Sequence, residues 1–196
     1  PDVLFDNFYY FIDGEDIPYD NGYKKKKIAQ NELKNIGLNE FIKNDLGIFK
    51  GVIKKSFIIE NSILYNENYR LAEDFLFYLD CFLNNGKVLF IPETLYMYRQ
   101  RKNSLITTVN EEYYIQLIKA TEYVLSKLEG QLLIEDYTKK LLEERLRKQR
   151  ILYNYYLISN NLKRREFKEA TLLIFKDFKV TKLLVKNVLK KIKSYL

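Results

Sequence analysis

Residues 70–77 read Arg-Leu-Ala-Glu-Asp-Phe-Leu-Phe, so two adjacent acids precede an almost wholly apolar run. Acids in the first turn of a helix are favoured because they complement the helix dipole. Glu73 and Asp74 therefore predict a helix start, and the helix is expected to cover 73–84 and to end at the Asn-Gly pair that follows. Such a start is ordinary and by itself implies no chemistry.

The sequence around this helix mixes short β-rich runs with helical stretches. Aromatic and β-branched residues predict a strand over 3–12 and two short strands over 87–91 and 94–99, on either side of Pro92. Helical spacing of apolar residues predicts a helix over 24–43. Residues 13–23 are expected to form an acidic, turn-rich loop, and 50–60 fit either a strand or a helix.

From residue 110 onward the chain has no proline and a single glycine, and its apolar positions follow a nearly continuous helical period. Three helices are expected, over about 111–129, 131–160 and 163–194. The predicted fold class is α/β, with an α/β domain over residues 1–108 and an all-helical C-terminal region over residues 109–196.

Composition excludes several kinds of chemistry. The 196 residues include no His and one Cys, which excludes Ser-His-Asp catalysis, imidazole metal ligands, an intrachain disulfide and a thiolate zinc site. The seven glycines form neither a dinucleotide-binding motif nor a P-loop. Cys81 lies in an apolar run and is predicted to be an inert buried thiol. Chemistry must then rest on carboxylates, Arg, Lys, Tyr and backbone dipoles.

The net charge of +7 is concentrated at the C-terminal end. Residues 162–196 hold eleven Lys and Arg against three Asp and Glu, and within them 180–196 form a basic amphipathic pattern. This pattern is typical of a helix that binds an anionic membrane surface. The alternative is a helix that packs its apolar side on its own domain. No nucleic-acid partner is expected, because the rest of the chain is slightly acidic and carries no such motif. We expect a cytoplasmic protein. If its tail binds a membrane, the protein would lie at the inner face of the plasma membrane.

Three segments follow one another in order: a basic segment that begins Gly51-Val-Ile-Lys-Lys, then Ala72-Glu-Asp-Phe75, then a block from Lys87 to Thr107 that contains Tyr-Met-Tyr-Arg-Gln-Arg and Ser-Leu-Ile-Thr. Their order and spacing resemble the C-terminal half of the catalytic domain of family 2 glycosyltransferases, bacterial inverting enzymes with the GT-A fold. The strand over 3–12 resembles the one that this family places after its metal-binding loop. The resemblance implies a partial GT-A-like domain over roughly the first 108 residues.

The resemblance assigns catalytic roles to the two acids. An inverting transfer needs a base that takes the proton of the acceptor hydroxyl, and the family assigns this base to the second acid of its Glu-Asp pair, here Asp74. Glu73 then orients or binds the acceptor.

Further site residues follow from the Lys87–Thr107 block. Arg99 and Arg101 are expected to bind the diphosphate of the donor, since arginine suits bidentate contact with phosphate. The alternative is that both are solvated surface. Tyr98 and Ser104 are expected to bind the acceptor.

The resemblance also implies partners. These are a nucleotide-sugar donor and a saccharide or lipid-linked saccharide acceptor in surface polysaccharide synthesis. The complete enzyme is expected to use a divalent metal (Mg²⁺ or Mn²⁺) held upstream of Pro1, and no metal ligand is expected in this chain. Asp13-Gly-Glu-Asp16 is interpreted as an acidic surface loop.

Because Pro1 is no natural initiator, we expect this chain to be a piece of a longer protein and to be inactive on its own. The alternative is a non-catalytic membrane- or protein-interaction module.

Overall fold

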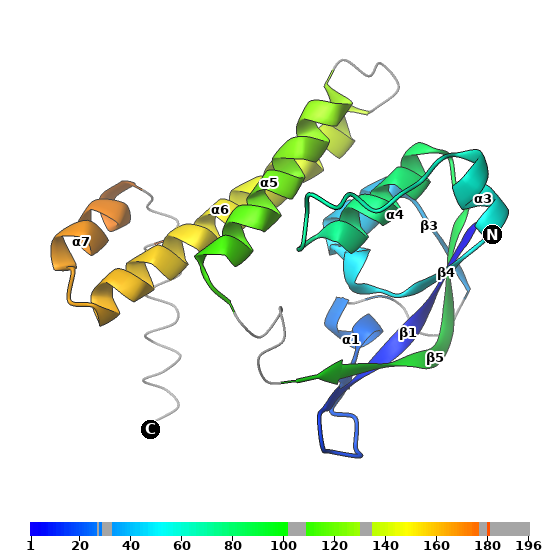
Figure 1. Cartoon of the computed structure of the whole chain (residues 1–196), viewed down its shortest axis with the longest axis horizontal. Helices are drawn as coiled ribbons and strands as arrows, with labels where there is room; N and C mark the ends of the chain where they lie inside the picture. The colour runs from blue at the N-terminus through cyan, green and yellow to red at the C-terminus, as the bar shows by residue number, and fades with distance from the viewer. Residues whose placement is uncertain (27, 29–32, 102–108, 130–134, 177–179, 181–196) are drawn as a thin grey trace.

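A computed structural model describes residues 1–26, 28, 33–101, 109–129, 135–176 and 180. It has a mixed α/β part followed by a helical region, which confirms the predicted fold class (Figure 1). Among the described residues no helix combines the length and the apolarity needed to cross a membrane.

The described strands form one five-stranded sheet in the order β2-β1-β5-β3, with β4 also paired to β1. The central pair, β1 and β5, is parallel, and its register extends from Val3 opposite Val88 to Ile12 opposite Gln100. The other pairings are antiparallel. The strands are β1 (Val3–Ile12), β2 (Asp20–Asn21), β3 (Lys34–Ile36), β4 (Gly51–Ile53) and β5 (Val88–Gln100).

The strand predicted over 3–12 is confirmed as β1, but the prediction of two strands separated by Pro92 is wrong. β5 continues through the proline. The register shifts here, since Phe5 pairs with Phe90 whereas Asn7 already pairs with Thr94. Such a bulge needs no ladder hydrogen bond from the bulged residues, so a proline without an N–H group is accommodated.

The helix predicted over 24–43 is also wrong. The described parts of this stretch contain the end of α1 (Gly22–Lys26), strand β3 and most of α2 (Leu38–Asn44). Pairing of β3 with the start of β5 outweighs the local helical spacing. The loop predicted over 13–23 contains β2. Residues 50–60 form both expected structures, β4 and then α3 (Lys55–Glu60).

The predicted helix at the two acids is confirmed as α4 (Glu73–Leu83). Helix α4 packs against the 3-10 helix η1 (Leu46–Ile48), and the two approach closely at Gly47. A Cβ atom on Gly47 would lie 2.9 Å from Cα and Cβ of Phe75, closer than such atoms pack. Phe75 in turn stacks on Phe41 of α2 with 5.3 Å between ring centroids. The first turn of α4 is therefore fixed from two sides.

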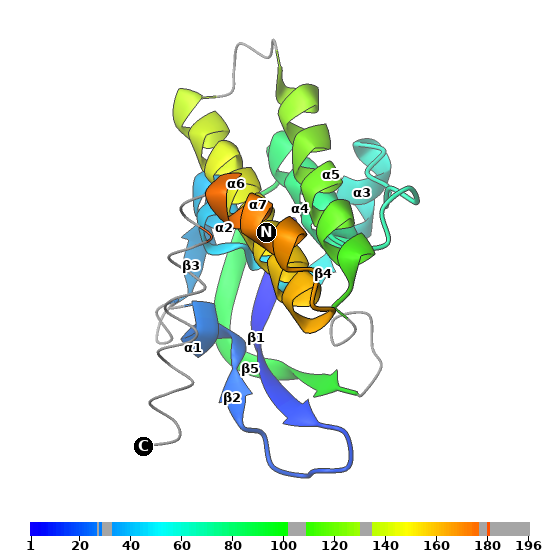
Figure 2. The same cartoon turned by 90° about the vertical axis from the view of Figure 1, so that its left-hand side faces the viewer.

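The helical region contains α5 (Glu111–Leu128), α6 (Asp136–Lys163) and α7 (Phe167–Lys176), and α5 and α6 form a long antiparallel pair (Figures 1 and 2). The helices predicted over 111–129 and 131–160 correspond to α5 and α6. The third differs at its start, because α6 continues to Lys163 and Arg165 takes a left-handed conformation (φ 64°) before α7 begins. The basic tail over 180–196, apart from the buried Val180, lies outside the described residues.

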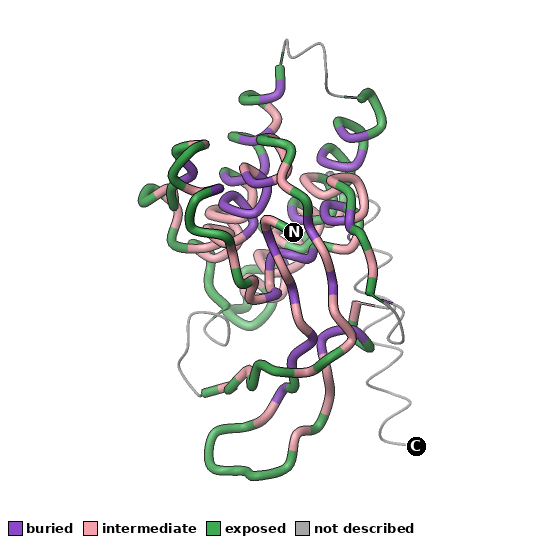
Figure 3. Tube along the Cα trace, turned by 90° about the vertical axis from the view of Figure 1, so that its right-hand side faces the viewer, coloured by how far each residue is buried: buried purple, intermediate pink, exposed green. Residues whose placement is uncertain are grey.

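The helical region packs on the α/β part through α2 and α4. Buried positions recur at intervals along the helices (Figure 3), and Val124 of α5 and Leu142 of α6 belong to the same apolar cluster as Phe5 of β1. Lys127 of α5 also donates to Asp80 of α4 over 2.6 Å. The domain division between residues 108 and 109 stays a prediction, since both parts contribute to this core.

A second polar connection joins α6 to the end of α2 at Asp45. Its carboxylate forms ion pairs with Arg145 of α6 and with Lys26, the latter over 3.5 Å. Desolvation would raise the pKa of Asp45, but Arg145 and Lys26 outweigh it and lower this pKa below its ordinary value of 3.8.

The close approach at Gly47 predicts an asymmetric response to alanine substitution. Gly47→Ala should lower the free energy of unfolding by about 1–3 kcal/mol, because the new methyl group displaces the first turn of α4. Gly37→Ala is the matched control, since a Cβ there meets nothing within 4 Å. Gly37 is the N-cap of α2, where alanine is less favourable than glycine, so this variant should lose no more than about 1 kcal/mol and less than Gly47→Ala. Denaturant titration of both variants measures this, and equal effects would contradict the packing described.

The Asp45 ion pairs predict a pH-dependent contribution to stability. Because the folded-state pKa of Asp45 is lowered, the stabilisation is complete above its ordinary value of 3.8 and is lost as the pH falls through the lowered value. More than half of the Asp45 side chain is exposed, so Asp45→Asn should cost only about 0.5–1 kcal/mol at neutral pH. Unfolding free energies of the two proteins should converge on acidification; a constant difference down to pH 3 would count against these pairs.

Candidate active site

A cavity of about 1250 Å³ lies between the α/β part and the helical region. On one side it is lined by η1, the start of α4 and the last residues of β5, and on the other by α5 and α6. Five of the six site residues predicted from the sequence line it: Glu73, Asp74, Tyr98, Arg99 and Arg101. The sixth, Ser104, lies outside the described residues. Folding thus brings the acids and the arginines, 25 or more residues apart in the chain, to one cavity.

The backbone turns sharply immediately before the two acids. Ala72, the residue before α4, has φ 65°, which is costly for a residue with a Cβ atom. No side chain caps the helix at Ala72. Glu73 and Asp74 occupy the first turn, where they complement the positive end of the helix dipole.

The Asp74 carboxylate contacts residues outside its own helix. Lys50, which precedes β4, forms an ion pair with Oδ2, and the Tyr65 hydroxyl donates to Oδ1 over 3.3 Å. A carboxylate offers about four lone-pair directions, so these two donors leave others for a proton from a third group. About three quarters of the Asp74 side chain is buried. The carboxylate is therefore fixed in place and still has lone pairs open to a further hydrogen-bond donor.

The two neighbours of Asp74 have shifted pKa values. Burial, together with the charge of Asp74 and the hydrogen bond to it, raises the pKa of Tyr65 to about 12, so this hydroxyl remains a donor at neutral pH. Burial also raises the pKa of Glu73, as does the Asp74 charge, whereas Lys50 acts in the opposite direction. Glu73 thus gives up its proton less readily than an exposed glutamate.

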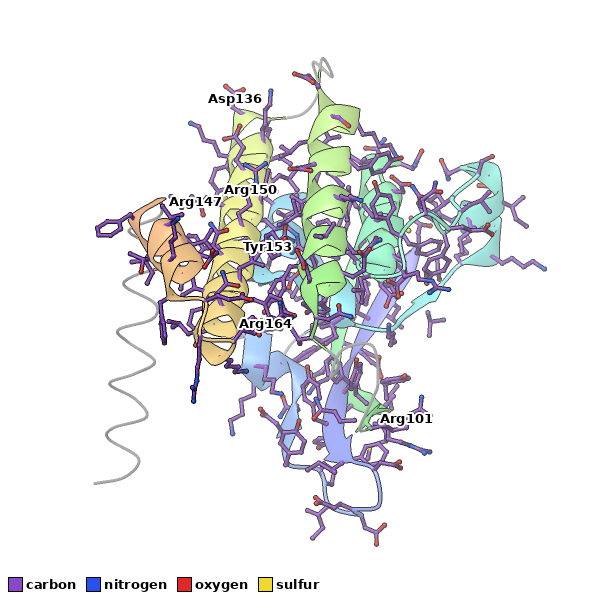
Figure 4. All side chains as sticks on the ribbon, turned by 60° about the vertical axis from the view of Figure 1, so that its left-hand side comes forward. Arg101, Asp136, Arg147, Arg150, Tyr153 and Arg164 are labelled. Carbon is purple, nitrogen blue, oxygen red and sulfur yellow. The ribbon has the colours of Figure 1, made fainter. Side chains whose placement is uncertain are left out.

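The end of β5 carries the arginines. Arg99 forms an ion pair with Asp13 over 3.3 Å, and both side chains are more than half exposed. Exposed pairs contribute little to stability, so an anion of higher charge can displace Asp13. Figure 4 shows Arg101 at the end of β5, far from Arg147 and Arg150 of α6 and from Arg164, which directly follows α6. Both arginines line the cavity, which is compatible with anion binding there.

Tyr98 belongs to an aromatic group at the same end of the sheet. Its ring lies 5.6 Å from that of Phe8 and 5.3 Å from that of Tyr10, between centroids. Burial, followed by the charge of Tyr96, raises the pKa of Tyr98. It therefore presents a neutral, amphipathic side chain to the cavity. Its role on the acceptor side stays a prediction.

The opposite wall comes from α6. Arg145 places its guanidinium 4.0 Å from the centroid of the Phe75 ring while it forms the ion pair with Asp45. Because Phe75 directly follows Asp74, α6 contacts the turn that carries the acids. The helical region thus forms part of the site.

Sequence reasoning missed four side chains of the site: Lys50, Tyr65, Arg145 and Gln149. Lys50 and Tyr65 precede Asp74 by 24 and 9 residues, and neither spacing corresponds to a helix or strand period. A local signal existed only for Lys50, which adjoins the basic segment at Gly51. Arg145 and Gln149 lie in a helix whose charged residues resemble any solvated surface.

The acidic side chains of the described residues do not gather into a metal site. The described part of the chain has no group of three or more Asp, Glu or Cys side chains that could hold a metal ion. In the loop Asp13–Asp16, Asp13 is paired with Arg99, as expected of an acidic surface loop. The divalent metal predicted for the complete enzyme stays a prediction.

No protein-family model matches the sequence, and no curated protein is significantly similar to it. The structure is similar to the crystal structure of S. aureus TarS residues 1–349 in complex with UDP-GlcNAc, with a TM-score of 0.52 and 16% sequence identity. The similarity covers 80% of this chain and 48% of the TarS chain, so this chain spans about half the length of that neighbour. The fold, an α/β sheet followed by helices, is thus a glycosyltransferase-like fold consistent with a partial GT-A-like domain.

Proposed function

We propose that this chain is the acceptor-side part of an inverting, family 2-like glycosyltransferase. It would transfer a sugar from a nucleotide-sugar donor to a saccharide or lipid-linked saccharide during surface polysaccharide synthesis. The observation that carries the proposal is the environment of Asp74. Its carboxylate is bound from outside its own helix by Lys50 and Tyr65, and it lines a cavity shared with Arg99 and Arg101. An acid that served only to start a helix would need none of these contacts.

The proposed reaction is a single in-line displacement. The oxygen of the acceptor hydroxyl attacks the anomeric carbon of the donor, and the bond from that carbon to the diphosphate oxygen breaks. Asp74 takes the hydroxyl proton through a lone pair that Lys50 and Tyr65 leave open. Glu73, whose pKa is raised, orients the acceptor beside it.

The leaving diphosphate carries the electron pair of the broken bond and must be stabilised. In the proposal Arg99 exchanges its ion pair with Asp13 for the diphosphate, and Arg101 adds a second guanidinium. A divalent cation, held by residues outside this chain, would supply further positive charge to the same group.

The donor class is supported by the structural neighbour. TarS is a glycosyltransferase, and its crystal structure contains UDP-GlcNAc, a nucleotide sugar. The base, the inverting course, the acceptor and the polysaccharide pathway are part of our proposal. So are a cytoplasmic location and contact of residues 180–196 with an anionic membrane surface.

Asp74→Asn in the complete protein should reduce kcat about 100-fold or more, because general bases contribute factors of this size. Donor binding should change little. Asp80→Asn is the matched control, since Asp80 lies on the same helix, pairs with Lys127 and does not line the cavity. Its transfer rate should equal that of wild type. Sugar transfer from UDP-GlcNAc and related donors measures this, and full activity of Asp74→Asn would exclude Asp74 as the base.

The chain over residues 1–196 should by itself show no turnover, because the proposal places the donor and metal site in residues outside it. Incubation of the isolated chain with nucleotide sugars, metal and saccharides tests this. Measurable transfer would contradict that placement. A complete protein with no transfer activity would instead favour the non-catalytic interaction module.

A further inference from the structure

Helix α7 packs on α6 through one of its faces. Ala170 is buried there in one cluster with Ile158 of α6, and Leu173 and Ile174 are partly buried against the same cluster. These α7 positions are three and four residues apart, so they form a single stripe along the helix. Figure 2 shows α7 in front of α6, on the outside of the helical region. The packed stripe thus accounts for one side of α7.

The opposite side of α7 is also apolar, but it is exposed. Phe167, Leu172 and Phe175 are 61%, 60% and 84% exposed. With 3.6 residues per turn, positions 167, 171 and 175 form one stripe and positions 168 and 172 form the stripe beside it. A helix that is apolar all round is ordinarily buried. The surface that we call the outer face is formed by Phe167, Lys168, Thr171, Leu172 and Phe175.

The charge around the outer face is positive. Lys168 lies on it, and the exposed run from Lys163 to Arg165 leads into α7. Figure 4 shows Arg164 at this end of α6. From 163 to 176 the chain has five Lys and Arg against two Glu. Apolar side chains within a basic surround favour an anionic bilayer, because the rings enter the interface while the cations meet lipid phosphates.

Two other occupants fit this face less well. The tail over 181–196 has five Lys and no acid, so its charge has the same sign as that of the outer face. Val180, the described residue that follows α7, is buried with Ala170 of the packed stripe. A second copy that paired this face about a two-fold axis would place Lys168 of both copies in one interface, and like charges across an interface are unfavourable.

We propose that the outer face of α7 is a membrane-docking surface for anionic phospholipid. Phe167 and Phe175 enter the bilayer interface, and Lys168 meets the lipid phosphates. This surface is separate from the contact proposed for residues 180–196, and it does not depend on sugar transfer. The outer face does not line the cavity, so docking through it does not itself occupy the cavity.

The first test uses tryptophan as a reporter, since the chain has no tryptophan of its own. The fluorescence of Phe175→Trp should shift to the blue when vesicles of equal parts phosphatidylglycerol and phosphatidylcholine are added, because the ring leaves water. Leu64→Trp is the matched control. Leu64 is 77% exposed and follows α3, which lies at the opposite end of the molecule from α7 (Figure 1). No shift at position 175, or equal shifts at both positions, would contradict the proposal.

The second test measures affinity by co-sedimentation of the full chain with the same vesicles. Phe175→Ser should weaken binding about tenfold, or about 1.4 kcal/mol, because the ring no longer enters the interface. Lys168→Gln should weaken binding about fivefold, the effect of one lysine at an anionic surface. Leu64→Ser should bind as wild type does. Phe175→Ser should also keep the unfolding temperature of wild type, since the side chain that it replaces is exposed.

The remaining outcomes overturn the docking surface. Equal binding by wild type and Phe175→Ser would assign vesicle binding to the tail over 181–196. Equal binding to vesicles of phosphatidylcholine alone would remove the role of anionic lipid. A wild-type dimer that Phe175→Ser dissociates in analytical ultracentrifugation would make a second copy the occupant. None of these measurements involves sugar transfer, so the docking surface and the proposed function can fail independently.

Discussion

The parallel pairing of β1 with β5 is the constraint on which the rest of the structure depends. It joins residues 3–12 to residues 88–100 and so brings the arginine-bearing end of β5 beside the first strand of the chain. β2 and β4 pair with β1, and β3 pairs with β5, so each of the other described strands is placed by this ladder. Parallel strands need a long crossover. Here that crossover includes η1 and α4 and therefore positions the two acids at the cavity.

Local patterns predicted those elements whose structure is determined locally. The aromatic and β-branched run of β1 and the first-turn acids of α4 identify their elements without help from distant residues. The stretch over 24–43 could not be predicted in this way, because β3 exists only through its pairing with β5. The prediction of two strands separated by Pro92 was wrong for a related reason. The bulge that accommodates this proline depends on the register with a strand more than 80 residues away.

The same division applies to the site. Asp74 and Glu73, together with Arg99, Arg101 and Tyr98, were predicted because each belongs to a short segment with a recognisable order, and folding brings these segments to one cavity. The side chains that hold or face them come from single positions in unrelated elements. Tyr65 and Arg145 carry no sequence signal of that role, since an ion pair or a ring contact across the fold leaves no periodicity in the chain, and Lys50 has only its position beside the basic segment at Gly51.

The shared cavity has a thermodynamic consequence. Its walls come from both sides of the junction between the sheet and the helices, and the apolar cluster crosses the same junction. A ligand that touches both walls binds only when the two parts are docked, so by mass action it raises the free energy of separating them by RT ln(1 + [L]/Kd). Occupancy of the cavity and cohesion of the molecule are therefore linked, and each strengthens the other.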